Sequence, residues 1–190
     1  MSTNSRENRQ LSLAVGPVGG AVAWLLGYAL IFLLAAPEIE DSPIQQIIEV
    51  IQGDPATYEL VGWTFYNAHF VDTIFEGIPV FGDVARNFIG GDGFSELLYL
   101  VPIGLLLTAG VAVGRARGAE ELSDGMVAGV TVMPGYLALS IAGVFLFRIG
   151  MEGVRGSPDL LPAIVLAGIV YPVVFAGLGG VLAALTVGES

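Results

Sequence analysis

The sequence contains no cysteine and no lysine, and each absence excludes a class of chemistry. Without cysteine there is no disulfide, thiolate nucleophile, iron–sulfur cluster or cysteine–zinc site. Without lysine there is no Schiff base and no phosphate-loop lysine, and all seven cationic residues are arginines. His69 is the only histidine, which excludes haem ligation by a histidine pair. We expect neither a cofactor nor a metal.

Basic charge is also scarce. Eighteen acidic residues oppose the seven arginines, so the formal net charge is −11 and the pI is near 4.2. Binding to nucleic acid depends on many Lys and Arg contacts to phosphate, and a polybasic membrane anchor needs a cluster of such residues. We therefore expect no nucleic-acid partner and no anchor of that kind.

Four long stretches of the chain have no charged residue at all. They comprise 28 residues between Arg9 and Glu38, 18 between Glu96 and Arg115, 23 between Asp124 and Arg148, and 29 between Asp159 and Glu189. About 20 apolar residues suffice for a helix to cross the hydrocarbon core. The sequence therefore predicts an all-α integral membrane protein that contacts the lipid bilayer through four transmembrane helices, at residues 11–36, 97–114, 125–147 and 160–187.

The composition of the whole chain resembles that of membrane proteins from extremely halophilic archaea. It combines the absence of lysine and cysteine with abundant acid and many Gly, Ala and Val residues. No motif carries this resemblance. It implies a habitat rather than an activity, because many such small multi-pass proteins have no assigned function.

Arginine placement predicts the orientation. Four arginines lie in the terminal segment 1–10 and the loop 115–124, against three in the segments 37–96 and 148–159. Because positive residues favour the cytoplasmic side, we expect both termini, with residues 188–190, in the cytoplasm. The segments 37–96 and 148–159 are then extracellular, and the protein is a multi-pass cell-membrane protein.

The segment 37–96 predicts an outer cap of about three short amphipathic helices. Ser42 and Pro43 are typical of a helix start, with Gln45 as the partner in a capping box, and Gly53 is typical of a helix end. Asp54-Pro55 predicts a second start in the same way. These helices would lie across the outer ends of the spans or on the lipid interface, where Trp63 and Tyr66 suit a half-wet position.

The second and third cap helices are predicted from apolar periodicity. A helical wheel over 59–76 gathers one set of residues on an apolar face and another on a polar face. The apolar set is Leu60, Trp63, Phe70, Val71, Ile74 and Phe75; the polar set is Glu59, Tyr66, His69, Asp72, Thr73 and Glu76. Phe81, Val84, Ala85 and Phe88 predict the third helix, closed by Gly90-Gly91.

His69, Asp72 and Glu76 are the one candidate for polar chemistry. Spaced three and four residues apart, they would meet on a helix. They could bind a divalent cation, or a carboxylate could orient the imidazole for acid–base work. The alternative is an ordinary surface hydrogen bond, because a single acid–histidine pair is common. We expect no catalytic residue, and we expect the glycine-rich segment 90–96 to supply turns.

The predicted spans hold no ionisable side chain, so any ligand site inside them must use backbone groups. Pro134-Gly135 and Pro172 should interrupt their helices and free carbonyl groups, with Tyr171 beside them. Helix shaping alone is the alternative, because Pro and Gly are common in membrane helices.

Small residues recur four apart and favour close helix packing. The pairs are Gly16 with Gly20, Gly110 with Gly114, and Gly125 with Gly129, together with the row Ala176, Gly180, Ala184. Some faces would serve internal packing, and spare ones could support a homo- or hetero-oligomer.

Three functions are compatible with the sequence. The first is a non-catalytic subunit or scaffold that packs with partners through the small-residue faces and the outer cap. The second is a small transporter or channel for neutral or apolar cargo that uses the kinked third and fourth spans. The third, less favoured, is a membrane enzyme that uses His69, Asp72 and Glu76.

Overall fold

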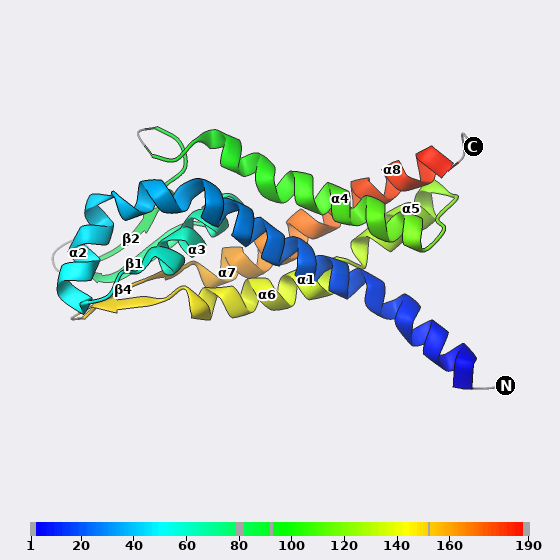
Figure 1. The fold of residues 1–190 in the computed structure, drawn as a ribbon, viewed down its shortest axis with the longest axis horizontal. Coiled ribbons are helices and arrows are strands. Elements are labelled where there is room, and N and C mark those ends of the chain that lie inside the picture. Colours follow the sequence, from blue (N-terminus) through cyan, green and yellow to red (C-terminus); the bar gives the residue numbers. More distant parts are fainter. Residues whose placement is uncertain (1–2, 79–81, 92, 152, 188–190) are drawn as a thin grey trace. The chain divides into compact units, whose positions relative to one another are not determined.

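The computed structural model describes residues 3–78, 82–91, 93–151 and 153–187, and most of them are helical (Figure 1). Four stretches are long and apolar enough to cross a membrane: Ala14–Glu40, Glu96–Ala116, Leu122–Leu146 and Leu160–Thr186. Large apolar side chains on them are exposed, for example Leu33 at 74% and Leu185 at 52%. Such exposure suits a lipid environment better than water. The prediction of four apolar helices is confirmed, and they indicate a location in a membrane.

These stretches are built from several helical elements. In chain order they are α1 (Thr3–Glu40), a 3₁₀ turn (Glu96–Tyr99) with α4 (Leu100–Ala116), α5 (Leu122–Val130) with α6 (Met133–Leu146), and α7 (Leu160–Pro162) with two π-helical segments (Ala163–Val170 and Pro172–Ala176) and α8 (Gly177–Val187).

The break in the third stretch lies at Pro134, and the irregular part of the fourth stretch, Ala163–Ala176, includes Pro172. Pro134 is the second residue of α6, after a break at Thr131 and Val132, and near a helix start the missing proline N–H costs little. Pro172 begins the second π-helical segment. Pro17 lies inside the continuous helix α1.

The contacts divide the chain into two compact units. Unit 1 consists of Met1–Leu25, Pro102–Leu139 and Gly168–Ser190, and unit 2 of Leu26–Val101 and Ser140–Ala167. Each unit is described by itself.

In unit 1 the helices approach one another through glycine. A Cβ added at Gly20 would overlap the carbonyl oxygen of Val132, and one added at Gly110 or Gly129 would overlap the carbonyl oxygen of Ala176. Gly16 faces Thr131 in the same way, Gly114 faces Ala183, and Gly125 faces Gly180 and Ala184. All the small-residue positions noted in the sequence therefore take part in internal packing.

Unit 2 contains a cap, defined by the described residues within 37–96 and 147–159. Its first helix, α2 (Pro43–Gln52), begins as predicted: Ser42 Oγ accepts a hydrogen bond from Gln45 N at 3.3 Å. Gly53 ends α2 at φ 83°. The Gln45 side chain does not complete the capping box; its Nε2 donates to Thr57 Oγ1 at 3.4 Å.

The predictions for the rest of the cap are partly wrong. The second helix, α3 (Thr57–Asn67), begins after Ala56 rather than at Pro55 and ends before His69. The chain then forms strand β1 (Thr73–Ile78). The third predicted helix is strand β2 (Gly82–Arg86), which contains Val84 and Ala85, while Phe81 lies outside the described residues. The apolar residues in 70–88 are compatible with both periods, and strand pairing decides between them.

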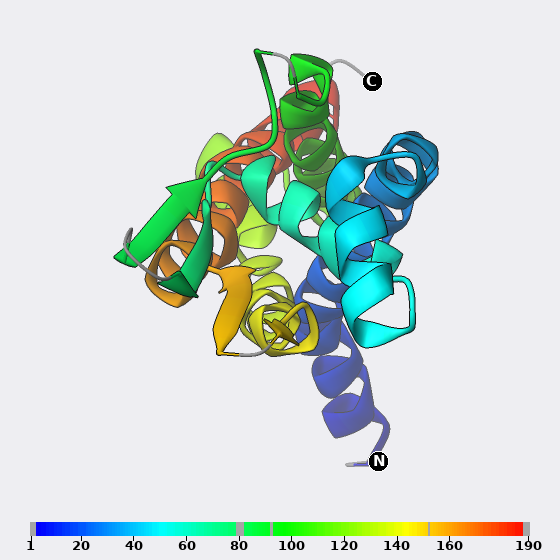
Figure 2. The same ribbon diagram turned by 90° about the vertical axis from the view of Figure 1, so that its left-hand side faces the viewer.

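The all-α prediction is therefore corrected by a four-stranded antiparallel sheet in the order β2-β1-β4-β3. Strands β3 (Ile149–Met151) and β4 (Val154–Pro158) come from the segment expected to be a plain loop. Figure 2 shows strands from these distant parts of the chain side by side, in green and in orange. β1 pairs with β4 from Thr73↔Pro158 to Glu76↔Arg155.

We expect Gly110→Ala to destabilise the protein by about 1–3 kcal/mol, because the new methyl group meets the Ala176 carbonyl and forces a backbone shift. Gly104→Ala, in the same helix, is the matched control. A Cβ there has nothing within 4 Å, so the change should be neutral or stabilising. Thermal unfolding in mild detergent measures both. Equal effects of the two substitutions would contradict the close packing.

Candidate functional site

Trp63 is the centre of the cap core. It is 1% exposed, and its Nε1 donates a hydrogen bond to the carbonyl oxygen of Phe147 at 2.7 Å. Its ring meets the edge of Phe75 at 5.4 Å and stacks on Phe88 at 6.3 Å. Gly156 of β4 lies against the ring, and a Cβ there would overlap it. The indole thus joins α3 to the sheet and to the end of α6.

Tyr66 is buried as well, and its hydroxyl donates to the backbone carbonyl of Ser140. Burial raises the pKa of this phenol far above its ordinary value, so Tyr66 stays protonated at every working pH. The position expected on a polar, half-wet face is therefore an interior one. Ser140 Oγ, also buried, has no hydrogen-bond partner within the described part of the chain.

His69 lies in the turn after α3 and is fully buried. Its Nδ1 lies 2.8 Å from the carbonyl oxygen of Phe65, so Nδ1 must carry the proton and donate it. Burial lowers the pKa of His69 to about 4. The imidazole is therefore neutral near pH 7 and is committed to the backbone.

His69, Asp72 and Glu76 do not form the triad that a continuous helix would give. His69 is interior, whereas Glu76 is exposed on β1. Asp72 joins the segment before β1 to the segment after β4, because its backbone carbonyl oxygen accepts a hydrogen bond from Asp159 N at 2.9 Å. Among the residues that the structure describes, no three His, Asp or Glu side chains are grouped to hold a metal ion.

Asn67 is the polar residue that sequence reasoning missed. Its Nδ2 donates to Val71 O at 2.8 Å, and its Oδ1 accepts from Phe88 N at 2.9 Å. The side chain is fully buried and connects the end of α3 with the chain after β2. One asparagine in an amphipathic pattern gives no signal of such a bridge.

The turn after α3 closes with Phe70 in the left-handed region at φ 57°, a position that usually favours glycine. Val71 N donates to Tyr66 O and Phe70 N to Asn67 O, which together make a Schellman ending. The Phe70 ring is 57% exposed and stacks on Tyr99 at 4.5 Å. This stack offsets part of the backbone strain.

The candidate residues of the spans lie in unit 1 and are closely packed. A Cβ at Gly135 would overlap the carbonyl oxygen of Pro17, while Pro134 itself is exposed. Pro172 is buried, and Tyr171, 7% exposed, meets the Phe175 ring edge-on at 5.1 Å. The carbonyls of Val132 and Ala176, next to the breaks, face glycines of other helices, so helix packing occupies the space in front of them.

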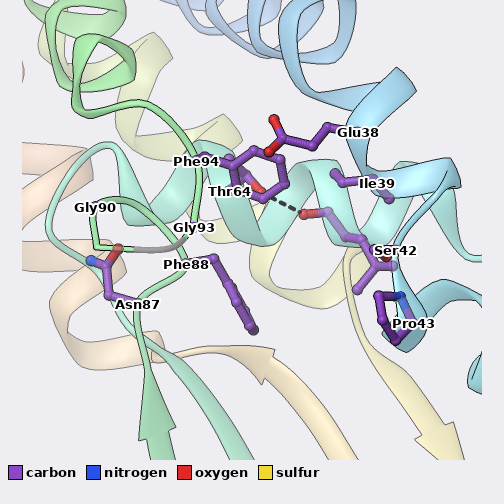
Figure 3. Close-up of a pocket in the computed structure, with 11 residues that line it drawn as sticks. Glu38, Ile39, Ser42, Pro43, Thr64, Asn87, Phe88, Gly90, Gly93 and Phe94 are labelled. Atoms are coloured by element: carbon purple, nitrogen blue, oxygen red, sulfur yellow. Dashed lines mark hydrogen bonds between the residues drawn. The ribbon is translucent and has the colours of Figure 1, made fainter.

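The cap has a cavity of about 510 Å³ between the end of α1, α3 and the loop that follows β2 (Figure 3). Ile39, Leu60 and Thr64 line it from the two helices, and Phe88 and Phe94 from the loop. The glycine-rich loop is closed on itself, because Phe94 N donates to Phe88 O and Gly90 N to Phe94 O, both at 2.8 Å. The turns expected from glycine here form a wall of the cavity.

Two polar groups of this cavity offer acceptors in particular, those of Thr64 and Glu38. The Thr64 hydroxyl donates to Leu60 O at 3.0 Å, which leaves only its lone pairs for a ligand. Glu38 contributes a carboxylate from the last turn of α1. No cationic side chain is among the described lining residues. A volume in the 300–1,000 Å³ range of ligand sites, apolar walls and an acidic rim suit an apolar group that carries a donor or a positive charge.

The chain belongs to a protein family, DUF7978, described as a family of unknown function; the family model matches residues 1–187. No curated protein and no solved structure matches it. Any function must therefore be argued from the chain itself.

Asn67→Ala should cost about 3 kcal/mol of unfolding free energy, because it leaves a buried carbonyl and a part-buried N–H without partners. Asn87→Ala removes an exposed side chain that accepts a local bond from Ile89 N and meets the Tyr99 hydroxyl, so it should cost less than about 1 kcal/mol. Chemical unfolding in detergent compares the two. A cost for Asn67→Ala no larger than that for Asn87→Ala would refute the bridge.

We expect the protein to lose stability in acid, because the buried His69 must then take up a proton. Its pKa is about 4 in the folded protein against an ordinary 6.5, so the unfolded chain binds the extra proton first. Stability from this residue is complete above about pH 6.5 and falls by about 2–3 kcal/mol as the pH approaches 4. Unfolding free energies at about pH 7.5 and about pH 4.5 measure the loss. His69→Gln should lose less over the same interval, and equal losses in both proteins would rule out a neutral buried imidazole.

Proposed function

We propose that this protein is a non-catalytic multi-pass membrane subunit that binds a protein partner through the cavity of its cap. The observation that carries the proposal is the contrast between the cap's polar residues and its cavity. Trp63, Tyr66 and His69 are committed to backbone carbonyls, whereas the cavity beside them is open and apolar with an acidic rim.

Catalysis would need a polar side chain that can exchange protons with a substrate. His69 is buried and bound to Phe65 O, and burial keeps its pKa low. Tyr66 is held protonated in the core. His69, which suggested acid–base chemistry in the sequence, and Tyr66 instead support the view that the cap is a rigid binding surface.

The cavity favours a particular kind of partner. About 510 Å³ accommodates two or three apolar side chains, and the Glu38 carboxylate at the rim attracts a positive charge. A partner segment with aromatic or aliphatic anchors next to an arginine or lysine therefore has the matching chemistry.

Small-residue faces contribute less to this proposal than the sequence suggested. Gly16, Gly20, Gly110, Gly125 and Gly129 all face backbone or small side chains of other helices in unit 1. The protein thus uses these faces for its own packing, and partner binding in a homo- or hetero-oligomer falls mainly to the cap.

Orientation is part of the proposal. The arginine bias favours cytoplasmic termini and an extracellular cap. The acidic composition supports a cell membrane in a salty medium, as in extreme halophiles, where exposed carboxylates keep the cap soluble.

A second candidate function is transport of neutral or apolar cargo. The π-helical segments Ala163–Val170 and Pro172–Ala176 favour it, because π-helical geometry is frequent at functional sites and alters backbone hydrogen bonding. The glycine contacts at the Ala176 carbonyl count against an open path there. We therefore place this candidate second.

Glu38→Arg tests the proposed subunit function. The substitution reverses the charge at the rim and adds bulk at the cavity mouth, so we expect at least a tenfold loss of the partner that co-purifies in mild detergent, equivalent to about 1.4 kcal/mol. Quantitative mass spectrometry of tagged protein measures the recovery.

Glu49→Arg is the matched control, because Glu49 is an exposed acid on α2 that does not line the cavity. Partner recovery should be unchanged in this variant. Recovery that is equal in both variants, or a strictly monomeric protein without any partner, would contradict the proposal.

A further inference from the structure

A second cavity, of about 390 Å³, lies in the cap where β1, β4 and β3 adjoin the end of α6. It is distinct from the cavity at Glu38, and its polar lining differs in sign. Arg148 and Arg155 contribute two guanidinium groups, Ser157 a hydroxyl group, Gly150 its backbone, and Glu76 one carboxylate.

Both arginines have hydrogen-bonding capacity to spare. Neither forms an ion pair with any residue in the described ranges, although the whole chain carries 18 acids. The Arg148 Cζ lies 4.3 Å from the centre of the Phe145 ring. A cation–π contact of this kind holds the guanidinium near the ring without using its N–H groups as hydrogen-bond donors.

The local charge is positive. Glu76 and Arg155 are cross-strand partners on β1 and β4, and Arg148 adds the second positive charge. Among the described lining residues, two guanidinium groups and one carboxylate give a net charge of +1, in a protein whose net charge is −11. Two arginines that line one cavity repel each other unless an anion lies between them, and phosphate oxygens match the guanidinium fork.

The cavity lies next to the ends of two apolar helices. Arg148 follows the third apolar stretch, which ends at Leu146, and Arg155 precedes the fourth, which begins at Leu160. Apolar side chains at these ends are exposed: Phe145 at 52%, Leu146 at 62% and Leu161 at 69%. An anion site at the ends of these helices has an apolar surface on one side and the polar sheet on the other. A membrane lipid matches this arrangement, because its charged headgroup adjoins its apolar chains.

We propose that Arg148 and Arg155 bind the phosphodiester of a membrane lipid in this cavity, with the acyl chains against the exposed apolar residues at the helix ends. A phosphodiester carries one negative charge, which the local net charge of +1 balances. Glu76 lowers the affinity for the anion, because its carboxylate repels the phosphate.

The test uses the full chain in detergent, titrated with a dansyl-labelled phosphatidylglycerol. Trp63 packs against Gly156, which lines the cavity, so energy transfer from tryptophan reports binding. Unlabelled phosphatidylglycerol should displace the probe, whereas diacylglycerol with the same chains and inorganic phosphate at equal concentration should not.

Variants that remove one charge each show whether that residue strengthens or weakens binding of the lipid probe. R148Q and R155Q should each weaken probe binding about tenfold, the effect of losing one charge-assisted hydrogen bond. E76Q should strengthen binding, because it removes the repelling carboxylate. R86Q is the matched control: Arg86 is exposed on β2 and does not line the cavity, so the same loss of charge there should change nothing.

Three results would overturn the proposal. The first is equal binding by R148Q, R155Q and R86Q, which would leave the cavity without a role. The second is weaker binding by E76Q, which would give the carboxylate the opposite function. The third is displacement by inorganic phosphate as effective as by the lipid, which would assign the cavity to a free anion.

Discussion

Backbone pairing between β1 and β4 is the interaction on which the cap depends. It joins the segment before the second apolar helix to the segment before the fourth, in a register that runs from Thr73↔Pro158 to Glu76↔Arg155. The hydrogen bond from Asp159 N to Asp72 O extends the connection by one step. This register places Gly156 under the Trp63 ring and Glu76 opposite Arg155. Without it, the indole loses the surface that it packs on, and the arginine cavity loses a wall.

The same architecture commits the conspicuous polar residues of the cap to hydrogen bonds with the backbone. Trp63, Tyr66, Asn67 and His69 all come from α3 or the turn after it, and all are buried. A buried donor or acceptor without a partner costs about 1–3 kcal/mol, and each of these side chains has a backbone partner. In our proposals, recognition therefore falls to groups at the edges of the cap: the acidic rim at Glu38 and the arginine pair at the end of α6.

The sequence predicted the elements whose causes are local. Uncharged length identifies the four apolar helices, and Ser42, Pro43 and Gly53 identify the bounds of α2. The strands were misread, because Ile74 and Phe75 continue the apolar spacing of α3 while also fitting the alternation of β1. Only pairing with β4, far along the chain, separates the two readings. Candidate residues such as Trp63 and His69 were found by type and spacing, but their partners Phe147 and Phe65 are backbone carbonyls, which a sequence pattern does not reveal.

Cross-linking of β1 to β4 tests this account most directly, and the absence of natural cysteine removes all background. Ile74 and Ser157 face each other as a residue pair of β1 and β4. Facing residues of antiparallel strands have Cα atoms about 4.5–5.5 Å apart, and a disulfide needs a Cα separation of roughly 4.4–6.8 Å. The double variant Ile74→Cys with Ser157→Cys should therefore form a disulfide. After brief, mild oxidation of the folded protein, mass spectrometry should find the two peptides joined in nearly every molecule, and joined much more slowly in protein unfolded beforehand. Two free thiols in the folded, oxidised protein would contradict the sheet and the cap built on it.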